Sequence, residues 1–149
     1  MDPILVVDDD PDDVELVRRA FRRLRVVNPV RVASDGEEAV AYLAGTGPFA
    51  DRLANPLPAL VLLDLKLPRR SGHEVLDWVK AQPVLRRIPV VVLTSSGERR
   101  DVDRAYDLAA NSYLVKPVRF DDLVRLIGEL NVYWMILNEP PGLAAEGDP

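Results

Sequence analysis

Five short apolar runs, each followed closely by polar residues, constrain the fold of this chain more than any other feature. Apolar runs of this length are typical of strands buried on both faces of a sheet. Stretches with apolar residues at helical spacing separate the runs, and this alternation predicts parallel βαβ units in an α/β fold. The runs are Ile4–Val7, Val30–Ala33, Ala59–Leu63, Ile88–Leu93 and Tyr113–Val115.

Four of these runs end in residues that fit one chemical site. The polar residues are Asp8 and Asp9 after the first run, Asp64 after the third, Thr94 after the fourth and Lys116 after the fifth. In an open parallel sheet the carboxyl ends of the strands lie along one edge, where ligands bind. We therefore expect three carboxylates, a hydroxyl and an ammonium to converge there.

This set of groups favours magnesium and phosphoryl chemistry. Three neighbouring carboxylates oppose one another's ionisation unless a cation lies among them, and hard oxygen ligands suit Mg²⁺. Asp64 ends the buried middle strand and is the candidate nucleophile for an aspartyl phosphate, with Thr94 and Lys116 beside the phosphoryl group. A lone aspartate, threonine or lysine at a strand end is usually a helix cap or a solvated group, so the prediction depends on their combination.

The composition narrows the classes of protein that fit this chain. Its 149 residues suit one domain, and the absence of cysteine excludes thiolate metal sites. A net charge of −5 argues against sequence-independent binding of nucleic acid. No apolar run is long enough to span a membrane, and the N-terminus lacks a secretory signal. We therefore expect a cytoplasmic protein that binds neither nucleic acid nor membranes.

Local signals set the expected helix boundaries. Asp10 and Ser71 are expected to cap the helices that follow them, and residues 45–58 are expected to form a long loop. The fifth helix is expected from Phe120 to about Leu137. His73, the only histidine, follows a glycine at a helix start, and we expect it at the surface without a chemical role.

The chain resembles the receiver domain of two-component response regulators. The segments that carry the resemblance are ILVVDDDPDD, LVLLDLKLPRRSGHEVL, IPVVVLTSS and NSYLVKP, within a match that runs from Ile4 to about Pro141. The resemblance implies a flavodoxin-like, doubly wound (βα)5 fold with strand order 2-1-3-4-5. It also implies a receiver domain over residues 1–138, a flexible tail over 139–149 and no output domain.

The same resemblance assigns roles to individual residues. Asp64 would be the phosphoacceptor, and Thr94 and Lys116 would bind the phosphoryl group. Magnesium would be held by Asp9, Asp64 and the backbone carbonyl of Lys66, with Asp8 acting through water. Tyr113 would be the switch aromatic that rotates inward when Thr94 moves toward the phosphate, and the Lys116–Pro117 peptide would be cis.

Two further segments indicate a particular subgroup of the response regulators. The loop GTGPFADRLANPLP and the ending NVYWMILNEPP are similar to single-domain response regulators paired with phytochrome-type histidine kinases. This similarity implies a histidine kinase, of the red-light photoreceptor class, as the upstream partner. Arg18 and Arg22 in the stretch RRAFRRLR are candidates for docking that kinase, the alternative being a solvated helix face.

Other functions remain as alternatives. An aspartyl-nucleophile phosphohydrolase also combines a strand-end aspartate with Mg²⁺, threonine and lysine, but usually carries a second aspartate two residues after the nucleophile. That position is Lys66 in this chain. A degenerate receiver that acts only as a scaffold is disfavoured by the complete set of site residues. Lys66 and Ser96 occupy positions that tune the lifetime of the phosphoaspartate in the family.

The end of the fifth helix is apolar nearly all round. Beside the stripe that covers the sheet, Leu126, Tyr133 and Leu137 form an adjacent flank. We expect this flank to mediate a homodimer, the alternative being that the C-terminal tail folds back over it. The output would then be a contact with a downstream protein whose identity the sequence leaves open.

Overall fold

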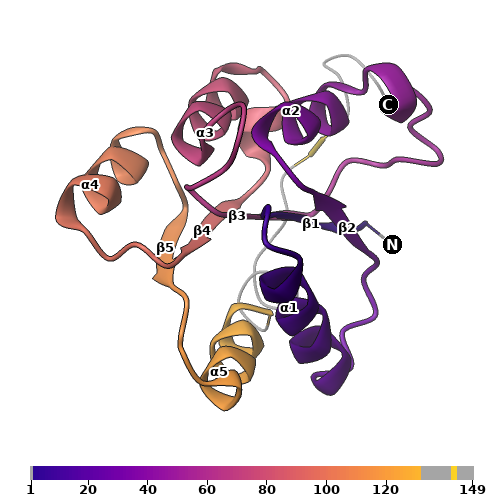
Figure 1. Ribbon diagram of the computed structural model, residues 1–149. Helices are drawn as coiled ribbons and strands as arrows, with labels where there is room; N and C mark the ends of the chain where they lie inside the picture. Colours follow the sequence, from indigo (N-terminus) through magenta and orange to yellow (C-terminus); the bar gives the residue numbers. More distant parts are fainter. Residues whose placement is uncertain (1, 132–141, 144–149) are drawn as a thin grey trace.

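The computed structural model describes residues 2–131 and 142–143, and Figure 1 traces the whole chain. A five-stranded parallel sheet has the order β2-β1-β3-β4-β5, and helices cover both of its faces (Figure 1). The predicted fold and strand order are therefore confirmed. The strands are β1 (Ile4–Val7), β2 (Val30–Ala33), β3 (Leu60–Leu63), β4 (Val90–Thr94) and β5 (Ser112–Val115).

The helices follow the strands in alternation. They are α1 (Pro11–Arg23), α2 (Gly36–Ala44), α3 (Gly72–Ala81), α4 (Arg99–Asp107) and α5 (Phe120–Asn131), with short 3-10 turns η1 (Gly47–Phe49) and η2 (Leu85–Arg87). The predicted continuation of the fifth helix to Leu137 lies outside the described residues. Asp10 and Ser71 cap α1 and α3 as expected, since their side chains accept hydrogen bonds from the amides of Asp12 and Glu74.

The sheet separates two apolar clusters because successive strand residues point to opposite faces. In β1, Ile4 and Val6 pack in the cluster on the α1 and α5 side, whereas Leu5 and Val7 pack in the cluster on the α2 and α3 side (Figure 1). The inner strands β1, β3 and β4 are buried on both faces, which explains why their sequences are continuously apolar, whereas the edge strands β2 and β5 are mostly half-buried.

The loop between α2 and β3 is held against the end of α2. The guanidinium of Arg52 donates to the carbonyl oxygens of Tyr42 and Asn55, at 2.7 and 3.2 Å. The hydroxyl of Tyr42 donates to the carbonyl of Pro56 at 2.7 Å, and its ring meets that of Phe49 edge-on. The loop predicted at residues 45–58 therefore has a defined conformation that satisfies the last carbonyls of the helix.

Two residues of the C-terminal segment 139–149 are described. The carbonyl oxygen of Gly142 accepts a hydrogen bond from Arg87 at 3.2 Å, and Leu143 packs against the cluster on the α2 and α3 side. Leu143 thus lies on the side of the sheet opposite α5. Among the helices within the described ranges, none has the length and apolar character needed to cross a bilayer.

Candidate functional site

Asp64 lies at the carboxyl end of β3 and is 8% exposed. Its backbone amide donates to the carbonyl of Val7 at 2.9 Å, which ties the residue to β1. One carboxylate oxygen, Oδ1, accepts from Thr94 Oγ1 at 2.8 Å and from the Lys66 amide at 3.3 Å. The other, Oδ2, accepts from Lys116 Nζ at 2.9 Å. The structure therefore brings Asp64, Thr94 and Lys116 into direct contact.

Lys116 follows β5, and its ammonium contacts three carboxylates. Nζ lies 2.8 Å from Asp8 Oδ2 and 2.9 Å from both Asp13 Oδ2 and Asp64 Oδ2. Burial alone would lower the pKa of Lys116, but the hydrogen bonds to these carboxylates outweigh it and raise that pKa above its ordinary value. The ammonium is therefore a permanent positive charge among acidic groups.

The prediction that the Lys116–Pro117 peptide bond is cis was wrong. This bond is trans, not cis. The trans form is the more stable one for a peptide before proline, and Lys116 already reaches all three carboxylates with it.

Asp13 is the member of this cluster that the sequence did not point to. It lies in the first turn of α1, where an acidic residue is readily explained by the helix dipole. The available signal was its position: α1 begins directly after β1, so its first turn lies at the same sheet edge as Asp8.

Asp8 and Asp9 differ sharply in exposure. Asp8 is 5% exposed, and its Oδ1 accepts from the Asp10 amide at 3.0 Å. Burial raises the pKa of Asp8, although the hydrogen bond from Lys116 partly offsets the rise. Asp9 is exposed. Ligand oxygens of Asp8, Asp9 and Asp64 all lie within 4.8 Å of one another, so these residues could hold a metal ion together.

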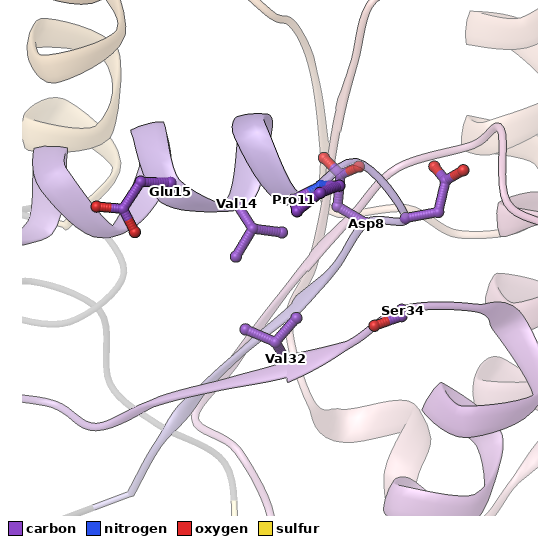
Figure 2. A pocket seen from close by; sticks show the side chains of 7 residues that line it. Asp8, Pro11, Val14, Glu15, Val32 and Ser34 are labelled. Carbon is purple, nitrogen blue, oxygen red and sulfur yellow. The ribbon is translucent and has the colours of Figure 1, made fainter.

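A cavity of about 290 Å³ opens beside Asp8 and Asp9, between α1 and β2. In Figure 2 the side chains of Val14 and Val32 face one another across it, with Glu15 and Ser34 at its borders. A hydrated cation can therefore approach the carboxylates from solvent, as Mg²⁺ requires because it keeps several waters. The lining residues are Asp8, Asp9, Pro11, Val14, Glu15, Val32 and Ser34.

The β4–α4 loop connects the site to Tyr113. The hydroxyl of Tyr113 donates to the carbonyl of Ser96 at 2.7 Å, and Ser96 Oγ donates to Asp101 Oδ2 at 2.6 Å. Tyr113 is half-buried, and burial raises the pKa of its phenol. Thr94 already points at Asp64 in this arrangement. The link from Tyr113 through Ser96 to Asp101 was not anticipated, because it joins residues of three different segments.

His73 is buried, whereas the side chain of Lys66 is exposed. The prediction that His73 is at the surface was wrong: it is 6% exposed, and its Nε2 lies 3.3 Å from the carbonyl oxygen of Asp101. The N-terminal turn of α4 approaches the start of α3 and buries the imidazole. The side chain of Lys66 is exposed, and only its amide contacts Asp64.

The predicted interaction residues are only partly described. Arg22 is exposed and donates to Glu15 at 2.9 Å, and Arg18 on the same helix is half-buried. Leu126 is half-buried against the cluster on the α1 and α5 side. Tyr133 and Leu137, the other two residues of the expected dimer flank, lie outside the described residues.

Comparisons with known proteins agree with this geometry. The family model of the response regulator receiver domain matches residues 4–128. The probable methanogenesis regulatory protein FilR2 of Methanothrix harundinacea is 43% identical over 141 residues, covering 95% of this chain and 88% of FilR2. Response regulator Rcp1 of a Synechocystis species is 37% identical over 132 residues, covering 89% of this chain and 88% of Rcp1.

Solved structures agree closely as well. The crystal structure of the phosphorylated cyanobacterial phytochrome response regulator RcpA has a TM-score of 0.88 at 35% identity, covering 95% of this chain and 99% of RcpA. The crystal structure of the Mn(2+)-bound form of Rcp1 has a TM-score of 0.86 at 35% identity, covering 95% of this chain and 100% of Rcp1.

Proposed function

This chain belongs to the response regulator receiver family, and we propose that Asp64 is the residue on which it accepts a phosphoryl group from a histidine kinase. The observation that carries the proposal is the pair of contacts on Asp64, with Thr94 on one carboxylate oxygen and Lys116 on the other. A hydroxyl and an ammonium so placed can donate to the oxygens of a phosphoryl group once it is attached.

The transfer forms one bond and breaks one. A carboxylate oxygen of Asp64 attacks phosphorus, the bond from phosphorus to the imidazole nitrogen of the kinase breaks, and that nitrogen keeps the electron pair and takes up a proton. Lys116 neutralises charge that the incoming phosphoryl group brings to an already acidic edge. The buried position of Asp64 holds it at the end of a rigid strand, so that little reorganisation is needed.

Magnesium is the cofactor we propose, held by Asp9, Asp64 and the carbonyl of Lys66, with Asp8 acting through water. The donor set fits a hard divalent cation, because three carboxylates gather within 4.8 Å and Asp9 is exposed toward solvent. The relative Rcp1 has a crystal structure described as Mn(2+)-bound, which supports a divalent ion in this family. When bound, the ion would screen the carboxylate from the charge of the phosphoryl donor.

The test of the acceptor compares two aspartate variants. Asp64→Asn should abolish acid-labile labelling by a small acyl phosphate in the presence of Mg²⁺, because an amide cannot form an acyl phosphate. Asp77→Asn, which changes an exposed aspartate of α3, should be labelled like the wild type. Labelling that persists on the Asp64→Asn protein would overturn the assignment.

We propose a phytochrome-type histidine kinase as the upstream partner, with Arg18 and Arg22 as docking residues on α1. The name of RcpA as a phytochrome response regulator supports this pairing, whereas FilR2 is named for methanogenesis, so the stimulus needs a direct assay. Phosphotransfer from a phytochrome kinase should fall when Arg18 and Arg22 are changed to glutamate. Arg86→Glu, on η2, is the matched control and should not alter the transfer.

Labelling by a small acyl phosphate separates docking from chemistry. The variant with both α1 substitutions should keep its full rate with that donor, because Asp64 and its contacts are untouched. Equal loss with kinase and small donor would show that the substitutions act on the site itself.

We propose that phosphorylation acts through Thr94 and Tyr113 on an interface with an unidentified downstream protein, and that the chain forms a homodimer through Leu126, Tyr133 and Leu137. Tyr113 supports the first part, because its hydroxyl bonds the carbonyl of Ser96 two residues after Thr94. Sedimentation of the wild type and of Leu126→Glu combined with Tyr133→Glu tests the dimer. A monomeric wild type at tens of micromolar, phosphorylated or not, would exclude it.

A further inference from the structure

Asp13 makes a contact that the roles assigned so far leave unexplained. Its Oδ2 lies 2.9 Å from Lys116 Nζ, although Asp13 and Lys116 are 103 positions apart in the sequence. Asp64 Oδ2 lies at the same distance of 2.9 Å from this ammonium. An ammonium has three N–H donors, and Asp8, Asp13 and Asp64 together accept all three. The side chain of Lys116 is 13% exposed, so these carboxylates replace water as its partners.

The carboxylate oxygens of Asp8 and Asp64 would also take part in binding the cation or the phosphoryl group, whereas those of Asp13 would not. Asp8 and Asp64 belong to the three-carboxylate group that could hold a cation, whereas Asp13 lies outside that group. Asp64 must also carry the phosphoryl group. When a cation and a phosphoryl group arrive, Asp13 is therefore the one carboxylate of the three that remains free to keep its bond to Lys116.

We propose that Asp13 is a positioning residue that holds the ammonium of Lys116 at the site in both the resting and the phosphorylated protein. The inference rests on the proposed roles of Asp64 and Lys116. Lysine carries its charge on a flexible four-carbon stem, so an ammonium without a fixed partner loses orientation when its other contacts change. Asp13 supplies that fixed partner from α1, a rigid helix capped by Asp10.

The variants are chosen to separate charge, contact and stability. Asp13→Ala removes the contact, and Asp13→Asn keeps an acceptor oxygen but removes the charge. Asp12→Ala is the matched control, because Asp12 lies in the same turn, is exposed, and its side chain makes none of the described hydrogen bonds. Urea denaturation of each protein defines conditions in which all of them are folded.

The first measurement is the rate of phosphorylation by a small acyl phosphate with Mg²⁺. Asp13→Ala should react about tenfold more slowly, as expected for the loss of one charge-assisted hydrogen bond that orients a reacting group. Asp13→Asn should fall between Asp13→Ala and wild type, and Asp12→Ala should match the wild type. A folded Asp13→Ala protein that reacts as fast as the wild type, or faster, would overturn the proposal. That result is expected if Asp13 competes with the phosphoryl group for the ammonium of Lys116.

The second measurement detects the ammonium itself. In the wild type, ¹⁵N-resolved NMR should show slowly exchanging ammonium protons of Lys116, without ligand, with Mg²⁺ alone and after phosphorylation. Asp13→Ala should lose this signal under Mg²⁺, where Asp8 and Asp64 are drawn to the cation, while Asp12→Ala keeps it. A purely structural role would leave the signal unchanged in the folded protein, and a signal that survives Asp13→Ala would overturn the proposal.

The two measurements also separate this inference from the proposed function. If Asp64 is not the acceptor, labelling of Asp64→Asn reveals that directly, and the ammonium signal under Mg²⁺ alone still decides whether Asp13 holds Lys116. If only the inference fails, the wild type is labelled on Asp64 as proposed while the Asp13 variants behave like the control.

Discussion

Gly72 begins α3 at a point where the missing side chain leaves room for the backbone of Asp64. A Cβ at this position would lie 2.6 Å from Leu65 Cα and closer still to the carbonyl oxygen of Asp64. Ordinary van der Waals contact starts at 3.4 Å, so Gly72→Ala requires Leu65 Cα to move by about 0.8 Å and the carbonyl oxygen of Asp64 to move further. Neither neighbour is the end of a flexible side chain, and the strain must therefore reach the proposed acceptor or the first turn of α3.

The expected cost has two parts. Overpacking of this kind typically destabilises a protein by about 1–3 kcal/mol, which urea denaturation measures. A displacement approaching 1 Å at a reacting group can lower a rate by up to about 10²-fold, and we expect phosphorylation by a small acyl phosphate to slow by at least about tenfold.

Gly128→Ala in α5 is the control for the same chemical change. A Cβ there meets only the side-chain tip of Leu24, at 3.3 Å, and an alanine inside a helix is favoured by about 1 kcal/mol over glycine. This variant should be phosphorylated at the wild-type rate with unchanged or greater stability. A Gly72→Ala protein that is phosphorylated as fast as the wild type would refute the reasoning that the close approach sets the position of Asp64.

Three further predictions concern the proposed magnesium ion, the proposed phosphoaspartate and Tyr113, the proposed switch residue. Asp9→Ala should weaken Mg²⁺ binding more than Asp8→Ala in a metal titration, because Asp9 is proposed to bind the ion directly and Asp8 only through water; the reverse order would contradict the proposed inner-shell role of Asp9. Lys66→Asn should shorten the lifetime of the phosphorylated protein, measured by phosphate release, because lysine has only donors and cannot accept a hydrogen bond from an attacking water, whereas an amide can; an unchanged or longer lifetime means that Lys66 points away from the site. Burial raises the pKa of Tyr113 above 10.0, so the free energy of unfolding should fall as the pH rises from 10.0 through the folded-state pKa, where only the unfolded phenol ionises. Tyr113→Phe should make this fall shallower in urea titrations at several pH values, and equal slopes would argue against the shift.

Much of the fold was predictable because its signals are local. The continuously apolar runs predicted the buried strands, and Asp10 and Ser71 marked the starts of α1 and α3. These features depend on backbone hydrogen bonding and on burial within a few residues, so the sequence around each position is sufficient.

The burial of His73 was not predictable in the same way. The sequence placed it correctly beside a helix start after Gly72, but its exposure depends on α4, whose residue Asp101 lies 28 positions later and contacts the imidazole. Nothing near His73 in the chain encodes where α4 packs.

The sequence alone determined which residues stand at the carboxyl ends of the strands, and in a parallel sheet this placed Asp8, Asp64 and Thr94 at one edge. Only the tertiary structure decided which of the edge residues touch. The ammonium of Lys116 reaches carboxylates that follow β1, begin α1 and follow β3, and it pairs with Asp13 because of the direction in which the first turn of α1 presents that side chain. Strand ends are set by short-range alternation along the chain. Contacts between side chains of different elements depend instead on strand order and on the rotation of each helix about its axis, which are settled when the two apolar clusters pack.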